Sequence, residues 1–299
     1  MSSMLRTRDL VKMFRGAKAL DRLNLDVPEG SVYALVGPNG AGKTTAIKIL
    51  MNILQPSLGS AEVLGINSRD LGPPQFGEIG YVSENQELPG WMTVQYFMAY
   101  VKPFYPTWDD ALATELIRQF DLPLGRKLRH LSRGMLMKAA LASSLAYRPR
   151  LIVLDEPFTG LDPLVRDEFI EGLLEIAEGT TILISSHDIA EIETFASHIG
   201  YLDRGRLQFS EELTSLSARF REVEVTLSDQ TTLPNLPPQW LDPQASASLL
   251  RFVDSQFDET HTRAEIQRLF GGVRNVAVKP MPLRAILVTL AKSGRKNAA

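Results

Sequence analysis

The stretch of the chain best suited to chemistry is a glycine-rich segment, GPNGAGKTT, from Gly37 to Thr45. Its glycines permit backbone angles closed to other residues, so successive N–H groups can point at one anion. Lys43 would place a point charge on the outer phosphates of a nucleotide, and the Thr44 hydroxyl can ligate Mg²⁺. The pattern predicts a phosphate-binding loop. Its predicted nucleotide-binding residues are Gly37, Asn39, Gly40, Ala41, Gly42, Lys43, Thr44 and Thr45.

The segments on either side of this loop indicate whether it binds phosphate. A glycine turn carrying a solvated lysine is the simpler alternative. Residues 31–36, SVYALV, form an apolar run typical of a buried strand, and residues 46–51 have apolar positions at helical spacing. A strand, a glycine-rich turn and a helix are the setting in which this motif binds phosphate. The loop alone does not indicate what the nucleotide is used for.

Two adjacent carboxylates follow the most apolar run of the chain, residues 151–154. Open α/β sheets bind ligands at the carboxyl ends of their strands, where the phosphate loop also emerges. We therefore expect Asp155 to ligate the metal and Glu156 to polarise water opposite the terminal phosphate. An isolated Asp-Glu pair after a strand more often caps a helix, but the apolar run and the upstream loop favour hydrolysis here.

Further candidates lie at the ends of other predicted strands. His187 follows the predicted buried strand 180–186 and could contact the terminal phosphate and orient the water. With Lys43 and Glu156 it completes the predicted catalytic set. Glu84 ends the strand 80–83 and could reach the metal through water, so the predicted metal ligands are Thr44, Asp155 and Glu84. Phe14 lies in an opening hairpin, where it could stack on adenine or pack in the core.

The positions of the predicted elements suggest two domains. Strands alternate with helices through most of residues 1–215, which is typical of a mostly parallel α/β sheet. Residues 88–147 lack strand patterns and are predicted to be a helical insert. Residues 220–295 are predicted to form a small α+β domain with strands near 222–227, 249–253 and 273–278, and no catalytic constellation is evident there.

The composition narrows the class of protein. A length of 299 residues, 44% apolar and 22% charged residues are ordinary for a globular protein of one large and one small domain. The net charge of −3 gives no reason to expect a nucleic-acid partner. The absence of cysteine excludes disulfides and fits a reducing compartment. The polar N-terminus and the lack of an apolar run of ~18 residues predict that any membrane role needs another chain.

Taken together, the motifs of residues 4–215 resemble the ATP-binding cassette (ABC) ATPases. Leu131–Met135, LSRGM, is similar to the family's signature motif, Gly160–Asp162 to its D-loop and Ser186–Asp188 to its switch histidine. The resemblance implies a P-loop NTPase with a RecA-like parallel sheet and an antiparallel β subdomain. It also places Phe14 at the adenine-stacking position. This chain departs from the family where Glu84 stands for the usual Q-loop glutamine, and where Arg133 and Met135 replace glycine and glutamine of the signature.

The resemblance further implies that two cassettes face head to tail and sandwich two ATP molecules. Ser132, Gly134 and Asp162 of one cassette would then complete the Mg²⁺–ATP site of the other, and Arg133 would add positive charge at that interface. The implied protein is the ATP-hydrolysing subunit of an exporter of drugs, peptide antibiotics or polysaccharides. It would form a homodimer on the cytoplasmic face of the membrane with separate permease subunits. The alternatives are a soluble mechanoenzyme of the same superfamily and a regulatory module.

Overall fold

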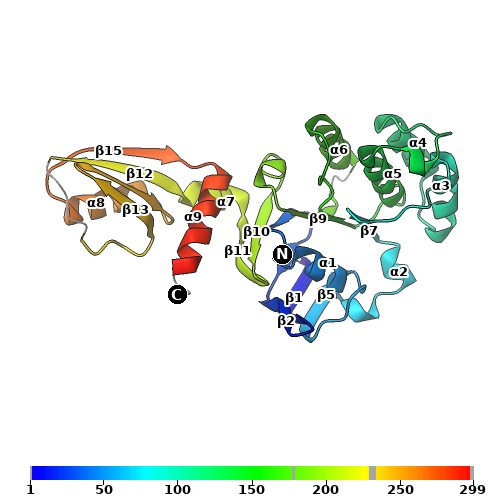
Figure 1. Cartoon of the computed structure of the whole chain (residues 1–299), viewed down its shortest axis with the longest axis horizontal. Coiled ribbons are helices and arrows are strands. Elements are labelled where there is room, and N and C mark those ends of the chain that lie inside the picture. Colours follow the sequence, from blue (N-terminus) through cyan, green and yellow to red (C-terminus); the bar gives the residue numbers. More distant parts are fainter. Residues whose placement is uncertain (1, 177–178, 229–233, 297–299) are drawn as a thin grey trace. The chain divides into compact units, whose positions relative to one another are not determined.

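The computed structural model describes residues 2–176, 179–228 and 234–296. The chain divides between Ser210 and Glu211 into two compact units, which we describe separately. The first unit contains two sheets and most of the helices, and the second contains one sheet and three helices in its described residues (Figure 1).

A six-stranded sheet, in the order β11-β10-β4-β9-β8-β7, forms the centre of the first unit. Its strands are β4 (Val32–Val36), β7 (Ile79–Ser83), β8 (Leu151–Asp155), β9 (Thr181–Ser186), β10 (His198–Asp203) and β11 (Arg206–Glu212). Every residue of β8 and β9 is buried, as their apolar runs predict for parallel strands covered on both faces. The parallel register pairs Asp155 with Ser185 and with Ser83, so these strand ends meet at one edge.

A smaller sheet of antiparallel strands packs against the other side of helix α1 (Lys43–Leu50). Its strands are β1 (Ser3–Phe14), β2 (Ala17–Leu23), β3 (Asp26–Pro28), β5 (Leu58–Val63) and β6 (Ile66–Asn67). Helix α1 begins three residues earlier than the apolar spacing predicts, directly after Gly42, and lies between the two sheets (Figure 1). Its buried Ile47, Ile49 and Leu50 contribute to the core that the sheets share. This packing fixes the phosphate loop at the start of the helix.

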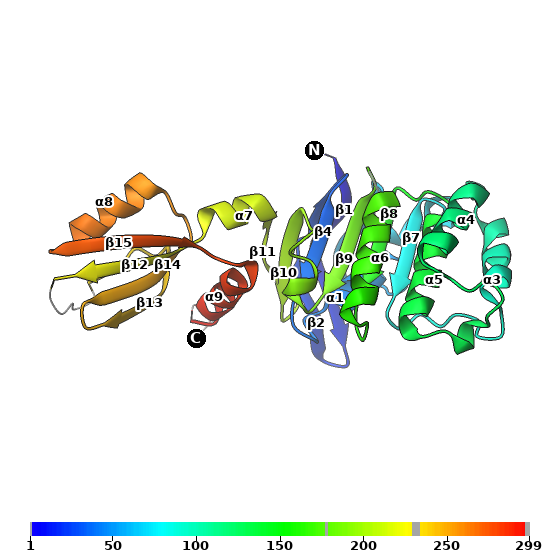
Figure 2. The same ribbon diagram turned by 90° about the horizontal axis from the view of Figure 1, so that it is seen from above.

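The helices between strands β7 and β8, which we call the helical insert, lie beside strand β7. The main helices of the insert are α3 (Val94–Val101), α4 (Asp110–Gln119) and α5 (Arg133–Leu145), and α2 (Pro73–Phe76) precedes them. Each main helix has a side-chain N-cap, namely Thr93, Asp109 and Ser132. Helix α6 (Pro163–Ile176) lies on the face of the six-stranded sheet opposite to α1, as Figures 1 and 2 show.

The second unit has a four-stranded antiparallel sheet in the order β13-β14-β12-β15. Its elements are α7 (Leu213–Arg219), β12 (Arg221–Leu227), β13 (Trp240–Ser246), β14 (Leu249–Asp254), α8 (Glu259–Leu269), β15 (Val273–Pro280) and α9 (Leu283–Lys296). The sequence predicts three of these strands and misses β13. That strand contains Pro243, which argues against a strand, but β13 is an edge strand, where proline is tolerated.

None of the helices in the described ranges is both long and apolar enough to cross a bilayer.

Candidate active site

The phosphate loop has glycine where the surrounding backbone leaves no space for a side chain. A Cβ atom on Gly37 would lie 2.0 Å from the carbonyl oxygen of Leu202 in β10. Gly42 has φ +110°, and a Cβ there would lie 2.6 Å from the carbonyl oxygen of Ala19. The Gly37 amide also donates to the Ser186 carbonyl at the end of β9, 3.3 Å away. Neighbouring strands therefore hold the loop in place.

The loop forms one wall of an open cleft of about 380 Å³. The residues that line it are Ala19, Asn39, Gly40, Ala41, Gly42, Lys43, Thr44, Thr45, Glu84, Glu156, Thr159 and His187. The structure thus brings Glu84, Glu156 and His187 together with the loop from strands far apart in the sequence. The cleft begins at the N-terminus of α1, where free backbone N–H groups and the helix dipole favour an anion.

Lys43 is buried in this cleft and has both neutral and charged partners. Its Nζ donates to the Gly37 carbonyl oxygen at 2.7 Å and to that of Pro38 at 3.3 Å. The same ammonium lies 3.0 Å from Oε1 of Glu156, with only 5% and 12% of the two side chains exposed. The ammonium that we expect to contact phosphate is therefore neutralised by the carboxylate that we expect to activate water.

Glu156 has a strained backbone and two polar partners for its carboxylate. Its φ of +52° lies in the left-handed region, which is unusual for a residue other than glycine and is often found at functional sites. Oε2 lies 2.8 Å from Nδ1 of His187. Burial alone would raise the pKa of Glu156, but the hydrogen bonds with His187 and Lys43 outweigh it and hold the pKa below its usual value. The carboxylate is therefore ionised at neutral pH.

Asp155 is buried one residue earlier and accepts two hydroxyl hydrogen bonds on the same oxygen. Thr44 Oγ1 donates to Oδ1 at 3.0 Å, and Ser185 Oγ donates to it at 2.8 Å. Burial raises the pKa of Asp155, although these two hydrogen bonds oppose the change. The described residues contain no cluster of three or more His, Cys, Asp or Glu side chains arranged for a metal. A hydroxyl and one carboxylate instead suit Mg²⁺, which keeps several waters and takes further oxygens from phosphates.

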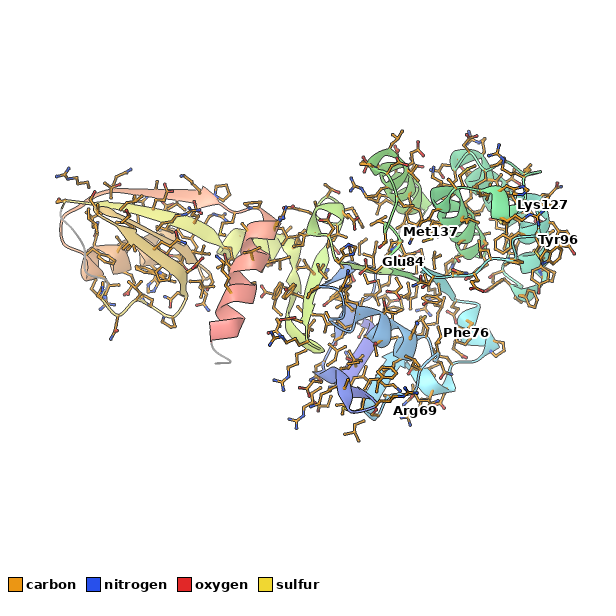
Figure 3. The ribbon with its side chains drawn as sticks, viewed as in Figure 1. Arg69, Phe76, Glu84, Tyr96, Lys127 and Met137 are labelled. Atoms are coloured by element: carbon orange, nitrogen blue, oxygen red, sulfur yellow. The ribbon has the colours of Figure 1, made fainter. Side chains whose placement is uncertain are left out.

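Glu84 lies where strand β7 leads into the helical insert (Figure 3). Its amide donates to the Asp155 carbonyl oxygen at 2.9 Å, so its backbone is tied to the neighbouring strand β8. Its Oε1 lies 2.6 Å from Nη2 of Arg133, the first residue of α5. Two of the three positions at which the chain departs from the family pattern, Glu84 and Arg133, are thus in direct contact.

Six predicted residues do not line this cleft, namely Gly37 and Asp155, whose contacts are described above, and four others. The Phe14 ring is 43% exposed, and Lys12 Nζ lies 4.9 Å from its centre. Ser132 accepts the Met135 amide hydrogen bond at the start of α5, and Asp162 accepts that of Val165 in α6. Gly134 is buried, and a Cβ there would lie 2.5 Å from a Val165 methyl group. Each of the three signature and D-loop residues therefore has a local structural contact within its own chain.

Three residues of the site were not predicted from the sequence. Ser185 orients both acidic residues, because its hydroxyl donates to Asp155 and accepts the Glu156 amide hydrogen at 2.9 Å. Thr159 lines the cleft, and its hydroxyl donates to Glu156 Oε2 at 3.4 Å. Ala19 contributes only backbone and a methyl group to the cleft wall, so its residue type carries no signal. Ser185 could have been found from its place beside His187 at a strand end.

Comparison with known proteins agrees with this geometry. A family model described as ABC transporter matches residues 20–159. The bacitracin transport ATP-binding protein BcrA of Bacillus licheniformis is 32% identical over 250 residues, covering 81% of each chain. The probable multidrug ABC transporter ATP-binding protein YbhF of Escherichia coli is 31% identical over 75% of this chain and 40% of its own length. A dimeric, post-hydrolysis ATP-binding cassette bound to ADP and Pi has a TM-score of 0.62 at 25% identity, covering 70% of this chain and 99% of that one.

The fold and the cleft define a P-loop ATPase of the cassette type, whose substrate is Mg²⁺–ATP. The extent and identity of the match to BcrA show the family. This chain belongs to the ATP-binding subunits of ABC transporters, which act as pairs of cassettes together with separate transmembrane components. The predicted family, fold class, ATPase activity, cofactors and partners are thereby confirmed.

Proposed function

We propose that this chain powers an exporter of drug-like or peptide-antibiotic compounds from the cytoplasmic face of the membrane. The observation that carries the proposal is the match to a bacitracin transport subunit over 81% of both chains, which extends beyond the cassette of about 210 residues. The multidrug designation of a second relative supports the same class of cargo. The net charge of −3 favours this function over a soluble mechanoenzyme acting on nucleic acid.

The geometry supports specific roles for the residues of the cleft. Lys43 and the loop amides bind the outer phosphates, while the Thr44 hydroxyl and Asp155 hold Mg²⁺. The metal, when bound, neutralises the charge that develops on the phosphates. Glu156 accepts the proton of the attacking water, and His187, 2.8 Å away, orients the Glu156 carboxylate. Phe14, exposed at the end of β1, is available to stack on the adenine ring.

The remaining predicted residues are proposed to act across a dimer. Ser132, Gly134 and Asp162 lie outside the cleft of their own chain, so we assign them to the nucleotide of the partner cassette. Ser132 is exposed at the N-terminus of α5, a helix of 13 residues whose first amides can face an anion. ATP would then complete the interface by bridging the two cassettes.

A second, more apolar groove is the proposed docking site of the permease. It has a volume of about 500 Å³ and lies between the parallel sheet and the helical insert, where it is lined by residues that include Ile53, Phe76, Tyr81, Phe97 and Tyr100. Gln86 and Glu87, which follow Glu84, form part of its wall. A cytoplasmic segment of the permease seated there would contact the same loop that lines the ATP cleft. ATP binding and transport would thereby share one structural element.

Co-purification from membranes tests the assembly. We expect a tagged chain expressed with the permease from its gene neighbourhood to retain that permease, and Ile53→Asp or Tyr100→Asp to lose it while keeping ATP affinity. Leu58→Asp is the control, because Leu58 is also an exposed apolar residue, 67% exposed against 53% for Ile53 and 49% for Tyr100, but lies outside the groove. Loss of the permease in the control as well would refute the groove assignment. ATP-dependent accumulation of bacitracin in inverted vesicles would support export, and its absence with intact assembly would refute this class of cargo.

A further inference from the structure

Two unusual charges of this cassette compensate each other within one chain. Glu84 and Arg133 are 49 positions apart in the sequence, yet Oε1 and Nη2 lie 2.6 Å apart. The side chains are 27% and 46% exposed, so the ion pair is accessible to solvent and can exchange partners. Each member lies at an end of a secondary structure element, Glu84 just after β7 and Arg133 at the start of α5.

Arg133 also contacts the turn that follows the catalytic strand. A Cβ atom at Gly160 would lie 3.3 Å from Arg133 Nη1 and 3.5 Å from its Cδ and Cζ atoms. The Arg133 side chain thus passes close to Gly160, which lies four residues after Glu156, and its guanidinium group contacts Glu84. Three segments meet at this one side chain: the loop after β7, the first turn of α5 and the turn after β8.

Glu84 also faces the cleft in which the triphosphate and its metal would lie. Oε1 of Glu84 is occupied by the Arg133 contact, and the positive guanidinium group beside the carboxylate disfavours a metal or its water shell at either oxygen.

On this basis we propose that Arg133 is a positioning residue that competes with Mg²⁺ for Glu84 and so ties the nucleotide site to the signature helix of the same chain. Glu84 pairs with Arg133 when the metal is absent and turns toward the metal's water shell when Mg²⁺–ATP is bound. The exchange frees the first residue of α5 from the β7 loop. Because Ser132 caps this helix, the state of one nucleotide site then alters the signature motif that the chain offers to its partner. The inference rests on the proposed role of the cleft.

A double-mutant cycle tests this competition without using ATP turnover. Mn²⁺ binding would be measured by electron paramagnetic resonance with a non-hydrolysable ATP analogue in the wild type, Arg133→Ala, Glu84→Gln and the double variant. We expect Arg133→Ala to tighten Mn²⁺ binding about two- to fivefold, the range for a partly exposed ion pair. In the Glu84→Gln background, Arg133→Ala should leave the Mn²⁺ affinity almost unchanged. Arg133→Lys, which keeps the charge, should stay close to the wild type.

Arg148→Ala provides the control, because Arg148, which directly follows the helical insert, pairs with Asp109 of that insert at 2.8 Å, and neither residue lines the cleft. An equal effect of Arg133→Ala in both backgrounds, or weaker Mn²⁺ binding, would overturn the inference. A result that changes on tenfold dilution of the protein would also overturn it, since Arg133 would then act across the dimer. A wild type that binds no metal–nucleotide complex would instead refute the proposed function itself.

Discussion

The substitution Glu156→Gln separates the two roles that the structure gives to this side chain. The carboxylate holds Lys43 at 3.0 Å, so the triphosphate must displace it to reach the ammonium. At an effective dielectric constant of 20, Coulomb's law gives about 5.5 kcal/mol for unit charges separated by this distance of 3.0 Å. The substitution converts only part of this Coulomb energy into tighter ATP binding, because Lys43 keeps its hydrogen bonds to the Gly37 and Pro38 carbonyl oxygens. We take the net gain in ATP-binding free energy as about 1.5 kcal/mol, the lower end of the range for a hydrogen bond to a charged group. This gain corresponds to about tenfold tighter ATP binding.

The same substitution removes the proton acceptor, so hydrolysis should fall about 10²- to 10⁴-fold. Isothermal titration calorimetry and a steady-state phosphate-release assay measure the two effects, and sizing in ATP should show a trapped dimer. Glu191→Gln is the control, because Glu191 is half-buried and hydrogen-bonds to Ser186 rather than to Lys43. Unchanged or weaker ATP binding by Glu156→Gln would refute the competition, and normal turnover would exclude Glu156 as the base.

Three further substitutions test the rest of the site. Lys43→Ala should weaken ATP binding at least 10-fold by calorimetry, an order-of-magnitude estimate for one lost charged contact, and unchanged affinity would exclude its phosphate role. Ser132→Arg should bind ATP normally yet stay monomeric in sizing experiments, and an ATP-induced dimer would contradict the composite site. Asp155→Asn should lose metal-dependent ATP binding but melt at a higher temperature at pH 7, because its amide oxygen can keep both hydroxyl hydrogen bonds while the buried charge disappears. Burial raises the pKa of Asp155 in the folded state. The stability advantage of Asp155→Asn over the wild type is therefore absent below the unfolded-state pKa and grows as pH rises through the folded-state pKa. A lower melting temperature of Asp155→Asn at pH 7 would contradict this reasoning.

The parts of the fold that follow from burial were predictable from the sequence. Strands β8 and β9 are covered on both faces, so each contains a continuous apolar run, residues 151–154 and 182–184. The polar residues that follow those runs, including Asp155 and His187, are consequently brought to one edge. Strand β13 was missed because its position at the edge of the sheet, which makes Pro243 acceptable, is a property of the folded sheet and not of local sequence.

The contacts between distant side chains could not be predicted from the sequence. The sequence places both Lys43 and Glu156 at the ATP site, but it does not predict their ion pair, which depends on how the two side chains pack in the cleft. Arg133 was expected to add charge at the dimer interface, whereas the structure gives it a partner, Glu84, within its own chain. Motif spacing specifies where a residue lies along an element, but the direction of a long side chain depends on its neighbours in space.

The close approach of Leu202 to Gly37 has a consequence for how such sequences evolve. A side chain at position 37 would collide with the backbone of β10 whether or not a nucleotide is bound, since a Cβ would lie 2.0 Å from the Leu202 oxygen. Selection for folding alone would therefore retain this glycine. A descendant cassette that had lost ATP binding would still keep Gly37, whereas Lys43 could change together with Glu156, its ion-pair partner. Among diverged copies of this gene, the lysine is the informative marker of a working ATPase, and the glycine reports only an intact sheet.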